Sequence, residues 1–195
     1  MSTSPDGTIR VRVDPSNPGQ FFACCGLLEL ADRLWGGAEG WFDDGMFMLR
    51  PVGSPARATD LRALLAAIAG GALDQLDPDD DCASPLRLGP PFEMRLDWWH
   101  DEVAGGKPLK VWAGSMNVVR IARSMQNVLA RPEAQTEGVF DRAQIVYDSA
   151  EPDKKREPFY FDGRRGASAL PLNLGFAPDK LEMTTAAYPA VEFLC

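Results

Sequence analysis

Hydrophobic and polar positions alternate near the start of the chain and then change to a helical spacing. Residues 9–13 place two arginines between three apolar side chains, which predicts a half-buried strand. Residues 14–19 hold two prolines, a glycine and short polar side chains, a composition typical of a turn that caps a helix. The segment Gln20–Trp35 is apolar at most positions, so we expect a helix buried on most of its sides. The residues expected to face water are Glu29, Asp32 and Arg33.

The rest of the chain mixes helical and strand patterns without an internal repeat. The predicted elements are a hairpin at Trp41–Arg50 that turns at Asp44–Gly45, a short helix from Leu61 to Ile68 that Thr59 or Asp60 caps and Gly70–Gly71 closes, a strand at Phe92–Trp98, and strands around Val139–Tyr147 and Pro158–Phe161. The acidic run 77–81 and the segment 149–157 are predicted loops. With 195 residues and no long linker, the chain is expected to form a single α+β domain over residues 1–195.

The most amphipathic segment is a predicted helix over Met116–Ala130. Its apolar positions recur at helical spacing and form one stripe, which consists of Val118, Ile121, Ala122, Met125, Val128 and Leu129. The opposite stripe is polar and basic, and it consists of Asn117, Arg120, Arg123, Ser124, Asn127 and Arg131. No acidic residue occurs in this helix, although exposed helices usually interleave both signs of charge.

The chain as a whole is acidic, with a formal net charge of −8. Taken alone, this charge argues against nucleic acid as a partner. The excess of acid lies in the first half of the sequence, however, and the segment from Lys107 to Pro132 contains basic residues and no acidic one. Because local fields rather than total charge decide where a polyanion binds, this segment is a candidate contact for nucleic acid.

Three basic regions form the candidate nucleic-acid site. In the first, Gly114–Ser115 leaves backbone N–H groups near Lys110 at the start of the amphipathic helix, a combination that binds phosphate. The other two, Lys154–Arg156 and Arg164–Arg165, lie in predicted loops beside aromatic residues, which suits a single strand or an RNA backbone. The candidate residues are Lys107, Lys110, Ser115, Asn117, Arg120, Arg123, Asn127, Lys154, Lys155, Arg156, Arg164 and Arg165. Alternatively, the helical arginines are solvated or pair with the acidic half of the protein.

Enzyme, metal and membrane motifs are missing from the sequence. It has no glycine-rich phosphate loop with a lysine, no nucleophile elbow and one histidine, His100, so no catalytic residue is expected. Cys24 and Cys25 are expected to be buried and unreactive, and Cys82 and Cys195 stand alone, so we expect neither a disulfide framework nor a metal or cofactor site. The lack of a long apolar run and of a signal peptide predicts a cytoplasmic protein that does not enter a membrane.

Several segments in combination resemble a family of CRISPR-associated proteins. They are Asn17–Ala31 (NPGQFFACCGLLELA), Leu96–Trp99, Lys110–Gly114 with Ile121–Gln126, Phe161–Arg165 and Leu174–Pro178. From about Val11 onward, the chain is similar to the large-subunit-like proteins of subtype I-G, formerly I-U. The resemblance implies a non-catalytic subunit of a Cascade-type surveillance complex, in which a guide RNA pairs with target DNA while proteins hold the backbones and help to read the motif beside the target.

The same resemblance implies the partners: guide RNA, target DNA, other Cascade subunits and a separate helicase-nuclease. The sequence stops at Ala190–Cys195, inside an apolar run, which predicts a chain truncated at its C-terminus. Two other functions stay open. A protein-binding scaffold would use the tryptophan-rich segments as an interface and set the basic helix against an acidic neighbour. A small-molecule enzyme would need a concave site around His100.

Overall fold

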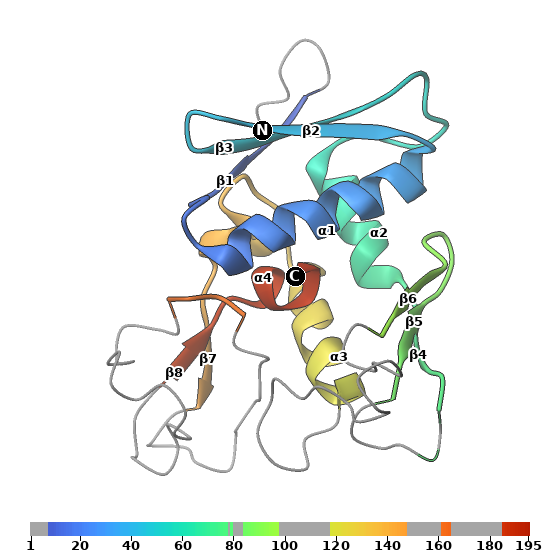
Figure 1. Cartoon of the computed structure of the whole chain (residues 1–195), viewed down its shortest axis with the longest axis vertical. Coiled ribbons are helices and arrows are strands. Elements are labelled where there is room, and N and C mark those ends of the chain that lie inside the picture. Colours follow the sequence, from blue (N-terminus) through green and yellow to red (C-terminus); the bar gives the residue numbers. More distant parts are fainter. Residues whose placement is uncertain (1–7, 78, 80–83, 98–117, 148–160, 165–184) are drawn as a thin grey trace, which may run out of the picture.

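The computed structural model describes residues 8–77, 79, 84–97, 118–147, 161–164 and 185–195. Within these residues, helices and small antiparallel sheets pack around one hydrophobic core, which confirms the predicted α+β class (Figure 1). The helices are α1 (Pro18–Trp35), α2 (Leu61–Gly70), α3 (Val118–Leu129) and α4 (Pro189–Leu194), with 3-10 turns η1 (Pro132–Ala134) and η2 (Val139–Asp141). The strands are β1 (Ile9–Arg12), β2 (Ala38–Asp43), β3 (Met46–Pro51), β4 (Leu73–Gln75), β5 (Leu86–Leu88), β6 (Met94–Leu96), β7 (Gln144–Tyr147) and β8 (Thr185–Ala187). No helix in this part of the chain is both long and apolar enough to span a bilayer.

The N-terminal sheet has the antiparallel order β1-β3-β2 and lies across α1 (Figure 1). The predicted hairpin is confirmed, because β2 and β3 pair and turn at Asp44 and Gly45, which both have positive φ. Such a turn matches the twist of the flanking strands, and Asp-Gly is a favoured sequence for it. Strand β1 alternates buried and exposed side chains as predicted, which places Ile9 and Val11 on the inner face.

Helix α1 begins and ends as its sequence predicts. Asn17 is the N-cap and its side chain accepts a hydrogen bond from the Gly19 N–H, Pro18 fills the first turn, and Gly36 ends the helix in the left-handed conformation. The prediction that most sides of this helix are buried was wrong for its first two turns. Phe21, Phe22 and Cys25 are exposed there, whereas Gly19, Gln20, Ala23 and Cys24 of the same turns are buried.

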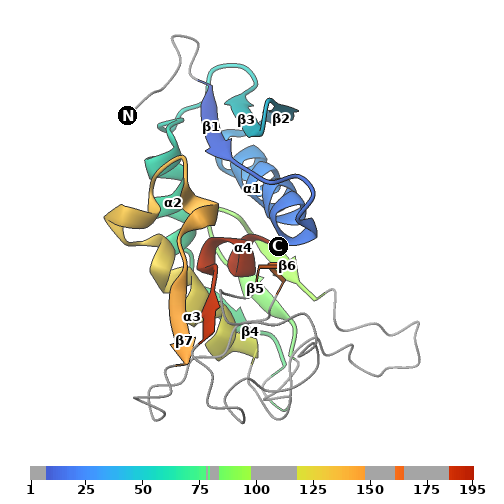
Figure 2. The ribbon, with the colours of Figure 1, turned by 90° about the vertical axis from the view of Figure 1, so that its left-hand side faces the viewer.

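The C-terminal helix α4 lies in the centre of the molecule, between α1 and α3 (Figure 2). A Cβ atom on Gly26 of α1 would lie 1.9 Å from the Leu194 carbonyl oxygen, so glycine allows the close approach of α1 and α4. The sequence pattern did not predict this helix, since a single apolar turn has no readable period.

Of the remaining predicted elements, two helices are confirmed and two strands are shorter than expected. Helix α2 and its Asp60 cap are confirmed, and α3 matches the predicted amphipathic helix between Val118 and Leu129. The strand expected at Phe92–Trp98 is reduced to β6, because Glu93 has a φ of 47° that breaks extended backbone. Residues 139–141 form η2 rather than a strand, so only Gln144–Tyr147 is extended. Residues 98, 149–157 and 158–160 lie outside the described part of the chain.

Candidate functional site

The solvent face of α3 carries the predicted basic residues. Arg120, Arg123 and Asn127 are exposed, while the predicted apolar stripe is buried. Arg131, just beyond the helix, is also exposed. The exposed polar face of α3 therefore bears cations and an amide and no carboxylate. Such a surface attracts a phosphate backbone and can donate hydrogen bonds to it.

Two contacts fix α3 against α2 and β4. An Nη2 hydrogen of Arg123 donates to the Leu73 carbonyl at 2.8 Å. Buried Gln126 donates through Nε2 to the carbonyls of Ile68 at 2.9 Å and Gly71 at 2.7 Å. The Ile68 carbonyl lies in the last turn of α2, where N–H donors are few, and it also accepts from the Gly71 N–H at 3.2 Å. Arg123 is therefore held in place by the backbone while its side chain stays exposed.

Most of the other candidate residues lie outside the described part of the chain. These are Lys107, Lys110, Ser115, Asn117, Lys154, Lys155, Arg156 and Arg165, and the same applies to His100 and Cys82. For the described candidates, the structure brings Arg120, Arg123 and Asn127 together on one helix, and it places Arg164 in a separate cluster.

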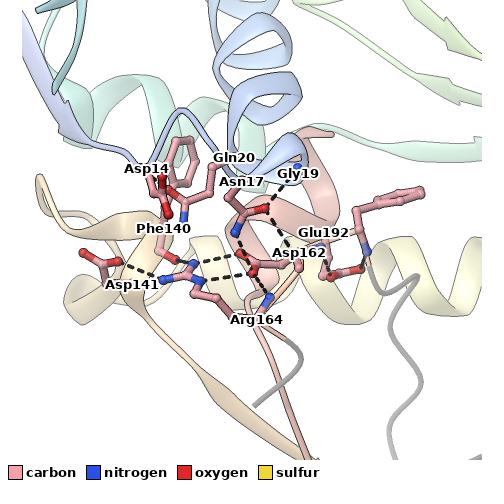
Figure 3. Close-up of polar contacts among 11 residues, drawn as sticks. Asp14, Asn17, Gly19, Gln20, Phe140, Asp141, Asp162, Arg164 and Glu192 are labelled. Atoms are coloured by element: carbon pink, nitrogen blue, oxygen red, sulfur yellow. Dashed lines mark hydrogen bonds and ion pairs between the residues drawn. The ribbon is translucent and has the colours of Figure 1, made fainter. Parts of the chain in front are cut away.

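Arg164 belongs to a polar cluster at the N-terminus of α1 (Figure 3). Its Nε and Nη2 donate to the two carboxylate oxygens of Asp162 at 3.0 and 2.8 Å. Its Nη1 donates to Asp141 Oδ1 at 3.0 Å, and Nη2 also donates to the Phe140 carbonyl at 2.6 Å. The guanidinium carbon lies 3.7 Å from the centre of the Tyr188 ring. Most of the N–H groups of Arg164 are thus occupied by the protein itself, which leaves few of them for the nucleic-acid contact predicted for this loop residue.

The Asn17 side chain connects this cluster to the cap of α1. Its Nδ2 donates to Asp162 Oδ1 at 3.0 Å, and its Oδ1 accepts from the N–H groups of Gly19 and Gly163 at 3.1 and 3.3 Å (Figure 3). A Cβ on Gly19 would lie 2.4 Å from the Phe161 carbonyl oxygen, so only glycine fits at that position without movement. The start of α1 and residues 161–164, which are far apart in the sequence, therefore meet here.

Glu192 joins α4 to the same cluster. Its carboxylate accepts from the N–H groups of Phe161 and Asp162, each at 3.3 Å, and the side chain is buried. Nearby, Gln20 is also buried, and its Oε1 accepts from the Asp14 N–H at 2.7 Å. Buried polar groups of this kind are costly unless they are paired, so the cluster fixes how these segments meet.

The electrostatics of the cluster favour a stable ion pair. Burial alone would raise the pKa of Asp162, but the hydrogen bonds from Arg164 and Asn17 outweigh it and hold that pKa below its ordinary value. The same pairing with Asp162 outweighs burial at Arg164 and raises the pKa of its guanidinium. The Asp162 carboxylate accepts four hydrogen bonds and stays ionised at neutral pH, so it is a poor general base.

The cysteines differ from one another in exposure. Cys24 is fully buried, and burial, with a smaller contribution from Cys25, raises its pKa to about 12. The prediction that Cys25 is also buried was wrong, because Cys25 lies on the open side of α1. Cys195 is exposed at the surface, but partial desolvation of its thiol and the neighbouring Glu192 raise its pKa to about 11. Among the described residues, no group of three or more histidine, cysteine or acidic side chains is arranged to hold a metal ion.

An apolar cavity of about 230 Å³ lies between α1, the β4–β6 sheet and α4. Its walls include Leu30, Leu88, Met94 and Phe193, and Glu192 is a polar residue at its edge. Since the Glu192 carboxylate already accepts backbone hydrogen bonds, the cavity wall presents little that could orient a polar ligand.

Comparisons of the chain with protein-family models, with curated proteins and with solved structures give no match. The resemblance to the subtype I-G proteins therefore rests on the sequence segments named above.

Proposed function

We propose that the chain is a non-catalytic subunit of an RNA-guided, Cascade-type complex in antiviral defence, as its resemblance to the subtype I-G large-subunit-like proteins implies. It contacts guide RNA or target DNA through the phosphate backbone, docks to other subunits, works in the cytoplasm and leaves cleavage to a helicase-nuclease. Recognition of the motif beside the target is part of the same proposal.

The observation that supports this function best is the solvent face of α3. Arg120, Arg123 and Asn127 are exposed together on a helix whose other face is buried, and the helix contains no acid. The bond from Arg123 to the Leu73 carbonyl positions one cation in advance, which lowers the entropy lost when a phosphate binds. Contacts to phosphate position a protein on nucleic acid without reading its sequence, as expected for a subunit that leaves base recognition to the guide.

The test compares two double variants of equal charge change. Arg120→Ala with Arg123→Ala removes the α3 cations, and Arg57→Ala with Arg62→Ala removes two exposed cations from the segment around the start of α2. Binding of a fluorescein-labelled single-stranded RNA is measured as a function of salt. The α3 variant should lower the slope of log K against log salt by about one to two, because each lost phosphate contact releases fewer counterions.

The α2 variant is the control and should keep the wild-type slope. Loss of the Arg123–Leu73 bond costs about 0.5–1.5 kcal/mol, so circular dichroism and urea unfolding must show that the α3 variant is folded under assay conditions. An unchanged slope in a folded α3 variant would show that the phosphate contacts lie elsewhere on the protein. Salt-insensitive assembly with other subunits and no RNA binding would favour the scaffold function instead.

The non-catalytic part of the proposal has its own test. His100→Ala should leave guide-dependent target binding within a few-fold of wild type. General acid–base catalysis contributes about 10²- to 10⁴-fold to a reaction rate. A catalytic role of His100 would therefore be easy to detect in a hydrolysis assay. Hydrolysis of RNA or DNA by the purified chain, abolished by His100→Ala in a folded protein, would replace this proposal with an enzyme.

A further inference from the structure

Three phenylalanine side chains form an exposed aromatic patch where α1 meets the β2–β3 hairpin. Phe21, Phe22 and Phe42 are 39%, 55% and 42% exposed. Phe21 stacks on Phe42 with ring centres 5.6 Å apart and meets Phe22 edge-on at 5.5 Å. We call these three residues the phenylalanine patch. Phe42 also contacts buried Phe47 at 5.3 Å, so the patch is anchored on the core.

Such a patch needs a physical explanation. Single exposed apolar residues are normal on protein surfaces, whereas contiguous aromatic rings mark interaction sites. The exposed thiol of Cys25 and the half-buried Leu28 follow the patch along α1 and extend it. Aromatic residues that sit on a rigid base lose little side-chain entropy on binding, and they dominate the energetics of many protein interfaces.

Two exposed acidic residues lie near one end of the patch. Asp44 is at the tip of the hairpin, two residues after Phe42, whereas Asp43 pairs with Met46 on the face of the sheet opposite Phe42 and Phe47. The Val13 N–H donates to the Gly45 carbonyl at 3.0 Å, which brings the tip beside the segment that contains Asp14. Asp14 is exposed, and hydrogen bonds from Ser16 lower the pKa of its carboxyl. Among the ion pairs of the described residues, none involves Asp43 or Asp44.

We propose that the phenylalanine patch binds an apolar protein segment flanked by lysine or arginine, with Asp14 and Asp44 receiving the flanking cations. The proposal deepens the proposed function, since another subunit of the complex would supply that segment. The carboxylates disfavour a nucleic-acid strand because they repel its phosphates. They also disfavour the same patch of a second copy, which would bring like charges together.

The proposal is tested on the full chain with defined peptide probes. The first probe is a fluorescein-labelled 18-residue amphipathic helix of leucine and lysine, and the second replaces each lysine by glutamate. Fluorescence anisotropy should show binding of the leucine–lysine peptide at least tenfold tighter than that of the leucine–glutamate peptide. Added salt should reduce this difference, because the flanking charges are exposed.

Variants separate the apolar and the charged contributions. Phe22→Ser should weaken binding of the leucine–lysine peptide about tenfold, while Leu76→Ser, at another exposed apolar side chain, leaves it unchanged. Asp44→Asn should weaken it several-fold, and exposed Asp79→Asn serves as the charge control. Asn-Gly is also a favoured sequence for the hairpin turn, so the Asp44 variant keeps the fold.

A reporter on Cys25, next to the patch on α1, checks the location of binding while the three phenylalanines stay unchanged. In a chain with Cys82→Ser and Cys195→Ser, acrylodan on exposed Cys25 should shift its emission to the blue when the leucine–lysine peptide binds. Equal binding of both peptides, or equal effects of Phe22→Ser and Leu76→Ser, would overturn the proposal.

Two other results would overturn it in favour of another occupant. A concentration-dependent dimer in sedimentation that Phe22→Ser abolishes would identify a second copy. If the chain binds single-stranded RNA and Phe22→Ser weakens that binding, the occupant of the patch would be nucleic acid. The peptide assay contains no RNA, so its failure leaves the α3 test intact, and failure of the α3 test leaves the peptide result intact.

Discussion

The Asn17 side chain donates to the Asp162 carboxylate at 3.0 Å although the two residues are 145 positions apart in the sequence. The bond joins the cap of the first helix to the short segment that also holds Arg164. Because Glu192 accepts from the backbone of the same segment, the cluster connects the start of α1 to α4. This arrangement gives the N-terminal turn a structural role in addition to capping.

Asp162→Asn should destabilise the protein by about 2–4 kcal/mol. Breaking a buried ion pair costs about 3–5 kcal/mol, and the cost is reduced here because Arg164 is partly exposed and keeps Asp141 as a partner. Urea unfolding followed by circular dichroism measures the difference. Asp141→Asn, on a more exposed partner of Arg164, should cost less than about 1 kcal/mol. Equal costs for the two variants would mean that burial of Asp162 contributes nothing.

Stability should fall in acid because of the same carboxylate. The pKa of Asp162 is lower in the folded protein than its ordinary value of 3.8, so the unfolded chain binds this proton more readily. The contribution of Asp162 is therefore fully present above about pH 4 and is lost as pH falls through the folded pKa. Urea midpoints of the wild type and Asp162→Asn, measured from pH 7 down to 2.5, should converge below pH 4. A constant difference over that range would contradict the assignment.

Gly19→Ala should cost about 1–3 kcal/mol although alanine favours helices. The added Cβ would lie 2.4 Å from the Phe161 carbonyl oxygen, and backbone cannot move aside as a flexible side chain can. Gly70→Ala is the matched control, because nothing lies within 4 Å of a Cβ at that helical position. The control should be stabilised by up to about 1 kcal/mol through helix propensity. A Gly19→Ala variant with the stability of the wild type would show that the backbone around Phe161 can shift.

Local patterns in the sequence predicted the elements with strong periodicity or clear caps. Strand β1, the Asp44–Gly45 hairpin, the capping turn at residues 14–19, the Asp60 cap and the amphipathic α3 all follow from neighbouring residues alone. The three-residue strands β4 and β5 were missed, because so short a segment gains its structure from pairing rather than from its own pattern.

The candidate site was predictable only in part, since its geometry depends on distant contacts. The exposure of Arg120 and Arg123 follows from the helical period, but the Arg123 bond to the Leu73 carbonyl does not. Gln126 belongs to neither stripe of the predicted helix, yet it is buried because the end of α2 offers it two carbonyls. Arg164 was predicted to be a nucleic-acid contact in a loop, since nothing local shows that Asp141 and Tyr188 lie beside it.

Cys25 should react with iodoacetamide at least about a hundredfold faster than Cys24 in the native protein. The two thiols are adjacent in sequence, but Cys25 is exposed, whereas Cys24 is fully buried with a pKa raised to about 12. A chain with Cys82→Ser and Cys195→Ser isolates the pair, and peptide mass spectrometry after timed quenching gives both rates. Cys24 should become reactive only as urea unfolds the protein, because its labelling requires opening of the core. Removal of the fast phase by Cys25→Ser identifies that thiol, and fast native labelling of Cys24 would contradict the packing of α1.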